Sequence, residues 1–340
     1  MSPHAVSVVI PTYNRARIVV RSVRSAILSC RDPDEIIVVD DGSSDETSAV
    51  LQPFRERIHY VRLPRGGAGR ARNHGIRIAR HPLIAFLDSD YEWVPGDLEA
   101  KRRLMDTRPE IAFCCSDFAA RSQDGGIVHN SLSYWHESPP LWKEVLGEGM
   151  DLSSLIQLPP EIQDSLVHIG NLYAFEMAAN YVFTTTWVVR KSAVGDALRF
   201  AEDLPTYEDW ECYGRLAQRG LCAYLASVTA WQHGHSGLRL TGTAVVDAVF
   251  ARMAVLERVW GTDPAYLAAH AREYCAVFIR QQHLLMRALL RQGRLREARE
   301  VLSRTQAAPL SWKVLAHLPT TLVQNGIRAR TVLHRARQTT

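Results

Sequence analysis

The chain has 340 residues, of which 46% are hydrophobic and 22% are charged, and its formal net charge is +4. This length allows one large α/β core or two domains of ~100–200 residues each, and the composition excludes a disordered chain. No apolar run approaches the ~18–20 residues that a membrane-spanning helix needs. The six cysteines form no Cys-x-x-Cys pair, as expected of reduced thiols. We therefore expect a soluble cytoplasmic protein.

The charge is unevenly distributed along the chain. Residues 241–340 carry 15 Lys/Arg against 6 Asp/Glu, a net charge of +9, whereas residues 1–240 carry 25 against 30, a net charge of −5. An acidic N-terminal part followed by a basic C-terminal part predicts two regions with different functions.

Strand-like and helix-like segments alternate in the first part. Strands are expected over residues 6–10, 35–39, 58–63 and 83–87, and helices over residues 15–30 and 69–80, with a further helix capped by Ser43 or Ser44. This alternation predicts an α/β fold with a mostly parallel, Rossmann-like sheet flanked by helices. Further strands are expected over residues 111–118 and 182–190, with an irregular stretch over residues 124–180 between them.

The pattern becomes wholly helical after Gly242. Asp263 is expected to cap a long helix that starts with Pro264, and Gly293 is expected to end it before an antiparallel partner. We therefore predict a domain over residues 1–240, with halves of about residues 1–120 and 121–240, and a helical region over residues 241–340.

Polar residues follow three of the predicted strands. Pro11–Asn14, Asp40-Asp41 and Asp88-Ser89-Asp90 should converge, because ligands of such sheets bind outside the carboxyl ends of the strands. Two carboxylates two residues apart can hold Mg²⁺ or Mn²⁺ together with diphosphate oxygens, although a lone Asp-x-Asp is most often a solvated turn. The position after a buried strand favours the metal–diphosphate interpretation.

Three further segments are candidates for chemistry. The loop over residues 65–69 leads into the basic first turn of the next expected helix. These residues either form a flexible connection or present backbone amides and arginines to an anionic ligand. Glu208 and Asp209 open a predicted helix, where acids are favoured by the helix dipole alone, but one of them could act as a general base. The segment His233-Gly234-His235 is a candidate functional site only if the fold brings it beside Asp90.

Taken together, these segments resemble the family-2 inverting glycosyltransferases with the GT-A fold, of the bacterial cell-surface polysaccharide type. The matching segments, in order over about residues 5–240, are Val6–Arg15, Ile37–Asp45, Ala71–Gly75, Ala85–Asp90 and Glu208–Glu211. The resemblance does not extend to the helical tail.

The resemblance implies a role for individual residues. It implies nucleotide-sugar binding by Pro11, Thr12, Tyr13, Asp41, Arg72, Asp88 and Ser89, metal binding by Asp90 and His235, and catalysis by Asp209 as base with Glu208 in support. Asp41 would accept a hydrogen bond from the base, and Arg72 would lie near the diphosphate. The sequence departs from the family at Tyr91, where a further aspartate is frequent, and in the glycine-rich, basic loop over residues 65–69.

The resemblance also implies the reaction and its partners. The expected activity is metal-dependent, inverting transfer of a sugar from a nucleoside-diphosphate sugar, with UDP favoured, to a hydroxyl of a saccharide or lipid-linked acceptor, with Mn²⁺ or Mg²⁺ as cofactor. Two alternatives remain open: a sugar-1-phosphate nucleotidylyltransferase, which would release pyrophosphate, and a non-catalytic sugar-nucleotide-binding component of a polysaccharide assembly complex. No nucleic-acid motif is present.

The basic tail suggests where the protein resides. From Arg280 onward it has 12 Lys/Arg against 2 Asp/Glu, and basic amphipathic helices bind anionic membrane surfaces. We expect either peripheral attachment to the inner face of the cell membrane or simple packing of these helices on the catalytic domain.

Overall fold

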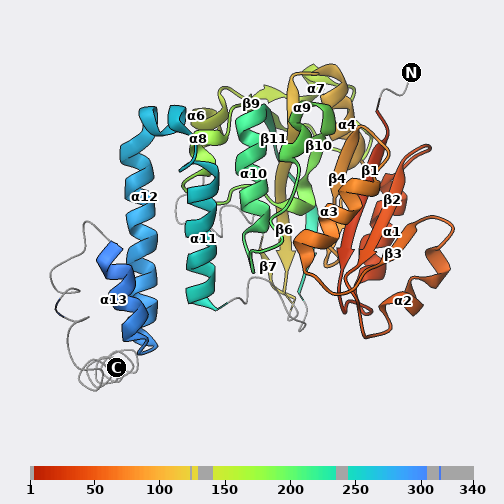
Figure 1. Ribbon diagram of the computed structural model, residues 1–340. Coiled ribbons are helices and arrows are strands. Elements are labelled where there is room, and N and C mark those ends of the chain that lie inside the picture. Colours follow the sequence, from red (N-terminus) through yellow and green to blue (C-terminus); the bar gives the residue numbers. More distant parts are fainter. Residues whose placement is uncertain (1–3, 123–124, 129–140, 235–243, 305–313, 315–340) are drawn as a thin grey trace, which may run out of the picture. The chain divides into compact units, whose positions relative to one another are not determined.

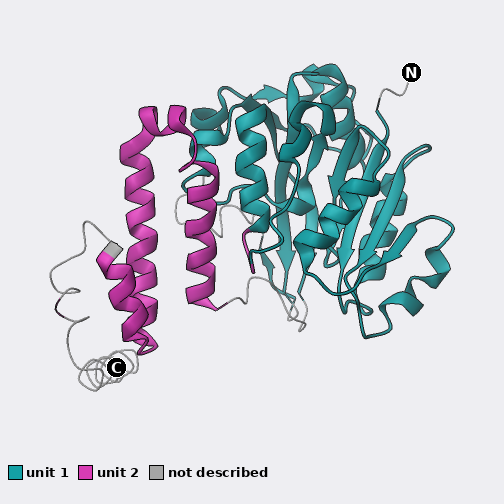
Figure 2. Cartoon of the chain, in the orientation of Figure 1, with its two compact units in different colours: residues 1–204, 208–238 teal, residues 205–207, 239–340 magenta. Residues whose placement is uncertain are grey.

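The computed structural model describes residues 4–122, 125–128, 141–234, 244–304 and 314. The chain forms two compact units, residues 1–204 with 208–238 and residues 205–207 with 239–340 (Figure 2). Each unit is described by itself below. The predicted domain limits, residues 1–240 and 241–340, stay a prediction.

The first unit is built on a mixed β-sheet (Figure 1). Its strands are β1 Val6–Thr12, β2 Glu35–Asp40, β3 His59–Arg62, β4 Leu83–Phe86, β5 Tyr91–Trp93, β6 Ile111–Arg121, β7 Ile127–Val128, β8 Met150–Asp151, β9 Leu166–Gly170, β10 Val188–Arg190 and β11 Leu221–His233. The spatial order is β3-β2-β1-β4-β10-β6-β11-β9-β8, with β5 beside β11 and β7 beside β6. Strands β3, β2, β1, β4, β6 and β11 all run in the same direction, and β10 lies antiparallel between β4 and β6.

Helices flank this sheet. In the first unit they are α1 Val19–Ser29, α2 Thr47–Val50, α3 Ala68–Ile78, α4 Asp97–Thr107, α6 Trp142–Leu146, α7 Leu152–Leu155, α8 Tyr173–Glu176, α9 Lys191–Val194 and α10 Glu208–Arg219, with 3-10 turns at Gln52–Phe54, Thr184–Thr186 and Gly195–Ala197. Because α1 and α3 connect strands in opposite directions along the sheet, right-handed crossovers place them on opposite faces. The predicted α/β fold with helices on both sides of the sheet is confirmed.

The buried strands follow from their composition. Every residue of β1 and β4 is buried, and in β2 all but Glu35 are. Such uninterrupted β-branched and aliphatic runs suit a strand that is covered on both faces. Helix α3 lies so close to β1 that a Cβ added at Gly75 would come within 2.4 Å of Cγ1 of Val9. A glycine at this position therefore lets the helix that carries Arg72 approach the strand that ends in Thr12.

The predicted helix cap at Ser43 or Ser44 is wrong. Helix α2 begins only at Thr47. The Ser43 amide donates to Asp40 Oδ1 (2.8 Å), and the Ser44 amide donates to Asn14 Oδ1 (2.8 Å). The first bond closes the turn after β2 and the second joins it to the turn after β1, so both serine amides are used before the helix starts.

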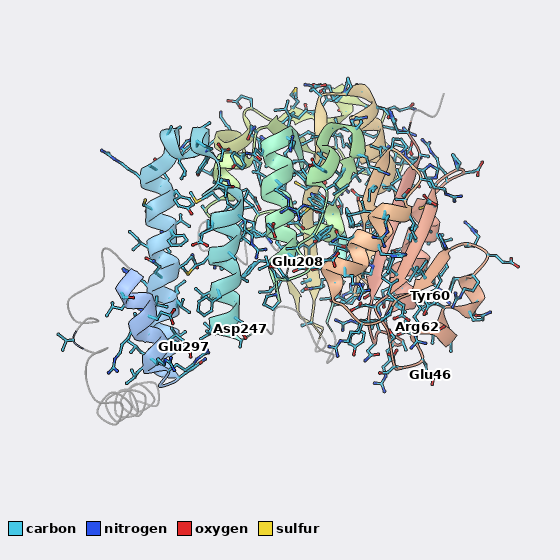
Figure 3. The ribbon with its side chains drawn as sticks, in the orientation of Figure 1. Glu46, Tyr60, Arg62, Glu208, Asp247 and Glu297 are labelled. Carbon is cyan, nitrogen blue, oxygen red and sulfur yellow. The ribbon has the colours of Figure 1, made fainter. Side chains whose placement is uncertain are left out.

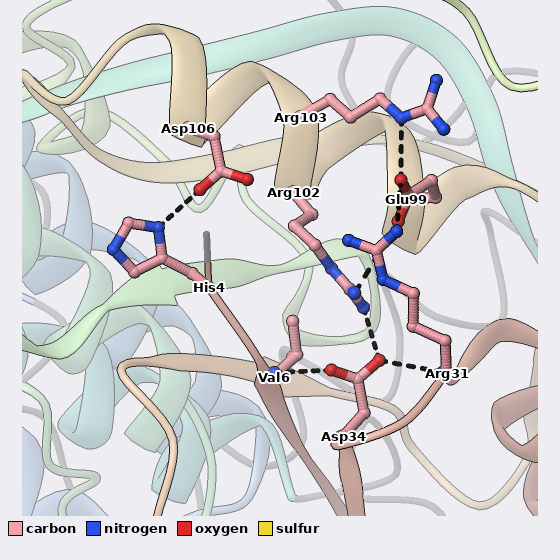
Figure 4. A network of polar contacts seen from close by, with 8 residues as sticks. All are labelled: His4, Val6, Arg31, Asp34, Glu99, Arg102, Arg103 and Asp106. Atoms are coloured by element: carbon pink, nitrogen blue, oxygen red, sulfur yellow. Dashed lines mark hydrogen bonds and ion pairs between the residues drawn. The ribbon is translucent and has the colours of Figure 1, made fainter. Parts of the chain in front are cut away.

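Ion pairs fix the edge of the sheet at which β1 and β2 begin (Figure 4). The Asp34 carboxylate accepts from the Val6 amide (2.8 Å), the Arg31 amide (3.0 Å) and the buried Arg102 guanidinium (2.5 Å). This network joins α4 to the start of both strands at the edge away from their polar carboxyl ends.

The second unit is helical, with α11 Val245–Val259, α12 Pro264–Arg291 and α13 Leu295–Arg304. The predicted cap at Asp263 is confirmed, since its Oδ1 accepts from the Tyr266 amide (3.0 Å). Gly293, at φ +71°, separates α12 from α13 as expected. Aliphatic residues of the three helices form the core of this unit, among them Val249 on α11, Leu285 and Leu289 on α12 and Ala298 on α13.

Candidate active site

The carboxyl ends of β1, β2 and β4 lie together, as predicted. The Asp41 amide donates to the Thr12 carbonyl (2.9 Å), and the Leu87 amide donates to the Val9 carbonyl (3.1 Å). Asn14 adopts φ +51°, and its side chain accepts the Ser44 amide from the second turn. The polar residues that follow the three strands therefore occupy one edge of the sheet.

Pro11 and Thr12 are buried at the end of β1, and Tyr13 is half-buried just after it. Among the described residues, no group hydrogen-bonds the buried Thr12 Oγ1. The Arg65 guanidinium lies over the Tyr13 ring, 4.5 Å from its centroid. A buried hydroxyl beside a partly exposed aromatic ring suits a ligand that offers both a polar edge and a flat face.

The Asp41 carboxylate holds the glycine-rich loop. Its Oδ1 accepts from the Gly66 amide (2.7 Å) and its Oδ2 from the Gly67 amide (2.8 Å). In the structure these two amides bind the Asp41 side chain, and their expected contact with an anionic ligand stays a prediction. Each carboxylate oxygen keeps a second lone pair, so the expected bond from a nucleotide base to Asp41 stays a prediction.

The neighbouring Asp40 has a structural task. Its carboxylate is fully buried and accepts from the Ser43 amide and from the Tyr60 hydroxyl (2.5 Å). Burial and this bond raise the pKa of Tyr60, which lies on β3 (Figure 3). Of the paired acids after β2, only Asp41 is therefore directed toward the loop.

Arg72 connects two distant parts of the chain. Its side chain is buried, with Nη2 donating to Asp88 Oδ1 and Nη1 to Glu208 Oε1, both at 2.8 Å. It thus joins the segment after β4 to the first turn of α10, where Figure 3 shows Glu208. In the structure Arg72 binds carboxylates, and its expected contact with a diphosphate stays a prediction.

Asp209 stands beside this arrangement with a shifted pKa. Burial and the neighbouring Glu208 carboxylate raise the pKa of Asp209 to about 7, although Arg72 opposes the shift. Its Oδ1 accepts from the Trp210 amide (2.7 Å). A carboxylate with a pKa near neutrality is a stronger base than an ordinary aspartate and remains largely ionised above pH 7.

Two further predicted site residues, Ser89 and Asp90, lie in the segment after β4. Ser89 is buried, and Asp90 is half-buried with its carbonyl accepting from the His233 amide (3.0 Å). The fold thus brings the start of the His233-Gly234-His235 segment beside Asp90. His233 Nε2 bonds Glu92 (2.9 Å), and His235 lies outside the described residues.

The carboxylates after β4 are the candidate ligands for a divalent cation. In the described ranges no group of three or more His, Cys, Asp or Glu side chains is arranged to hold a metal ion. Mg²⁺ and Mn²⁺ commonly take only one or two carboxylates and complete their shell with phosphate oxygens and water. Asp88 and Asp90 are both half-buried and lie two residues apart after β4, which suits a cation that arrives with a diphosphate, not one enclosed by protein ligands.

Comparison with known proteins shows what the chain is similar to. Residues 7–153, somewhat less than half of the chain, match the family model described as glycosyl transferase family 2. Over 124 residues the chain is 37% identical to the putative teichuronic acid biosynthesis glycosyltransferase TuaG of Bacillus subtilis, covering 35% of this chain and 49% of TuaG. Over 134 residues it is 31% identical to chondroitin synthase of Escherichia coli, covering 38% of this chain and 19% of the synthase.

The chain therefore spans about half the length of TuaG and less of the synthase. Among solved structures it is similar to residues 1–349 of S. aureus TarS in complex with UDP-GlcNAc, with a TM-score of 0.57 and 16% identity over 98% of this chain and 92% of that one. At this identity the likeness shows the fold. Within the helices that the structure describes, none has the length and apolar character needed to cross a membrane.

Three polar residues of the site were missed by the sequence analysis. Asn73 holds the segment before α10 through the Phe200 carbonyl (2.9 Å) and amide (2.8 Å). Asn180 lies 3.5 Å from Asp209 Oδ2, and the fully buried Glu176 lies next to Asn180. Asn73 falls inside a recognised motif, whereas Glu176 and Asn180 belong to a stretch with no periodicity or motif that could reveal them.

Proposed function

We propose that this family 2 domain transfers a sugar, with inversion, from a nucleoside-diphosphate sugar to an acceptor hydroxyl, with Asp209 as the base. The observation that carries the proposal is the Arg72 bridge. It places the segment after β4, the expected diphosphate side, next to the helix turn that holds Asp209. The binding of UDP-GlcNAc by TarS supports a UDP-sugar donor.

The proposed step is one displacement. Asp209 takes the proton of the acceptor hydroxyl while that oxygen bonds the anomeric carbon. The bond from this carbon to the diphosphate oxygen breaks, and its electron pair leaves with the nucleoside diphosphate. Thr12, Tyr13 and Asp41 hold the nucleotide, and the acceptor is a saccharide or a lipid-linked sugar.

A panel of nucleotide sugars tests this function. The full chain is incubated with each donor and Mn²⁺, and free nucleoside diphosphate is measured with and without added acceptors. We expect release of UDP from at least one UDP-sugar. Release of pyrophosphate from a nucleoside triphosphate and a sugar phosphate would instead indicate a nucleotidylyltransferase, and binding without release would indicate a non-catalytic protein.

We further propose that a divalent cation takes part, held by Asp90 with Asp88 close by. Such an ion supplies positive charge that offsets the charge developing on the leaving diphosphate. His235 is the second ligand that the resemblance implies.

Removal of the metal is expected to abolish turnover. With EDTA, UDP release should fall by at least ~10²-fold, because the charge on the leaving group loses its counter-charge, and excess Mn²⁺ should restore it. Asp90→Asn should show the same loss without rescue. Glu92→Gln, which removes a nearby carboxylate on strand β5, serves as the control. Full turnover in EDTA would contradict a metal at Asp90.

We also propose that the basic second unit attaches to anionic lipid surfaces. Exposed arginines on α12 and α13, among them Arg291, Arg296 and Arg299, provide the charge. Each arginine near such a surface contributes about 1 kcal/mol at moderate salt. Lipid-linked sugar acceptors reside at such surfaces.

Vesicle co-sedimentation tests the attachment. The variant R291Q/R296Q/R299Q should pellet at least ~10-fold less with phosphatidylglycerol vesicles than the unchanged chain does, from the loss of three such charges. R17Q/R24Q/R57Q removes the same charge from exposed positions of the first unit and should pellet normally. Equal pelleting of both variants would reject attachment through the second unit.

A further inference from the structure

Asn180 lies between two acidic side chains that neither the family motifs nor the sequence analysis connects. On one side its amide group is 3.5 Å from Asp209 Oδ2. On the other side is Glu176, at the end of α8, whose carboxyl group is fully buried. The orientation of this amide therefore decides whether Asp209 faces an N–H donor or a carbonyl oxygen.

The neighbours of Asn180 select one orientation. With the amide nitrogen directed away from Asp209, Nδ2 donates to Glu176 Oε1 (3.2 Å) and to the Val182 carbonyl (2.9 Å). In the opposite orientation Nδ2 would donate to Asp209 Oδ2 (3.5 Å) and Oδ1 would accept from the Val182 amide (3.4 Å), two longer bonds, but Oδ1 would also lie against the Glu176 and Val182 oxygens. Since the Val182 carbonyl carries no proton and can only accept, the amide nitrogen faces Val182 and the amide carbonyl faces Asp209.

Glu176 is itself held in place. Its Oε1 accepts the Tyr181 amide (3.1 Å), and its backbone carbonyl accepts Nε1 of Trp210 (2.9 Å), the residue after Asp209. Burial raises the pKa of Glu176 well above that of an ordinary glutamate, and the charge of Asp209 adds to the shift. A neutral Glu176 still accepts from Asn180 and leaves Asp209 without a second full charge beside it.

We propose that Asn180 is a positioning residue for the base: fixed by Glu176 and Val182, its carbonyl oxygen accepts a hydrogen bond from Asp209 once Asp209 holds the proton of the acceptor hydroxyl. When Asp209 is ionised, its negative charge faces the negative end of the Asn180 carbonyl dipole, which is unfavourable. When Asp209 is neutral, its Oδ2 donates to Asn180 Oδ1. The arrangement favours the protonated product form of the base. This inference rests on the proposed function of Asp209.

Other groups also act on Asp209, and the test leaves all of them unchanged. They are Glu208, Cys212 and Tyr213 on α10, Arg72 on α3, Asp88 after β4 and Glu176 on α8. Asn180→Leu keeps the number and branching of the side-chain heavy atoms and offers no dipole. Any change in the titration of Asp209 then reports the loss of the amide.

The experiment is a ¹³C-carboxyl NMR titration of Asp209 in the full chain, assigned with Asp209→Asn. Asn180→Leu is expected to lower the pKa of Asp209 by about one unit, the equivalent of one lost hydrogen bond to its neutral form. Asn171→Leu, the same change at an exposed asparagine nine residues earlier, should not move it. Asn180→Met replaces Asn180→Leu if the latter does not fold.

An unchanged or higher pKa in the Asn180 variants would overturn the proposal, because an N–H facing Asp209 would stabilise its ionised form. The acid limb of UDP release against pH should move down by the same amount. The titration requires no turnover, so absence of UDP release in the unchanged chain would reject the proposed function while the titration still decides the role of Asn180.

Discussion

Replacing Asp209 by asparagine should lower sugar transfer by ~10²–10⁴-fold, the usual contribution of a positioned general base. Asparagine keeps the shape and still accepts the Trp210 amide, but it cannot take a proton. Donor affinity, measured by calorimetry with UDP, should stay close to that of the unchanged chain. In that chain, kcat/KM should rise with pH and level off above about 7, where Asp209 is ionised.

The stability of the same variant gives an independent control. The pKa of Asp209 is about 7 in the folded protein against 3.8 for an ordinary aspartate. Between these values the folded state binds more protons than the unfolded state, so this group lowers the stability as the pH rises through that window. Asp209→Asn should therefore melt above the unchanged chain at pH 8. Full activity of the variant, or a melting point below that of the unchanged chain at pH 8, would contradict the assignment.

Replacing Arg72 by methionine should destabilise the first unit by about 3–5 kcal/mol, because it leaves Asp88 and Glu208 without their shared cation. The free energy is measured by urea unfolding followed through tryptophan fluorescence at pH 7.5. Arg80→Met removes an exposed arginine from its pair with Glu35 and should cost less than ~1 kcal/mol. A loss below 1 kcal/mol for Arg72→Met would show that the bridge is not needed for folding.

The Arg72 variants also test the electrostatics of the site. Because Arg72 opposes the rise in the pKa of Asp209, its removal should move the acid limb of the pH profile upward. Arg72→Lys keeps the charge, but its single ammonium does not reproduce two bonds at fixed angles. Lysine should therefore restore the position of the acid limb more fully than it restores the stability.

Local signals predicted the elements that lie next to each other in sequence and space. The β-branched runs of β1 and β2, with short connections after each, were sufficient for parallel pairing, and the pair Asp263-Pro264 was sufficient to start α12. The convergence of Thr12, Asp41 and the segment after β4 followed from the rule for carboxyl ends of parallel strands.

Long-range pairing was less accessible. Strand β10 enters antiparallel between β4 and β6, although its three residues lie more than 65 positions from either partner. Short elements from β7 to α8 occur in the described part of residues 124–180, the stretch that was expected to be irregular. The Arg72–Glu208 bond spans 136 positions. Motifs could name both residues, but only the folded chain shows that the guanidinium binds carboxylates.

The stereochemistry of the reaction tests the central claim most directly. The substrate for this test is the α-linked UDP-sugar that releases most UDP in the panel. Its transfer to water frees the sugar, and ¹H NMR identifies the anomer of this sugar before it mutarotates. A single displacement assisted by Asp209 predicts that the β-anomer appears first, and that Asp209→Asn forms it at least ~10²-fold more slowly. Initial release of the α-anomer would contradict the proposed mechanism.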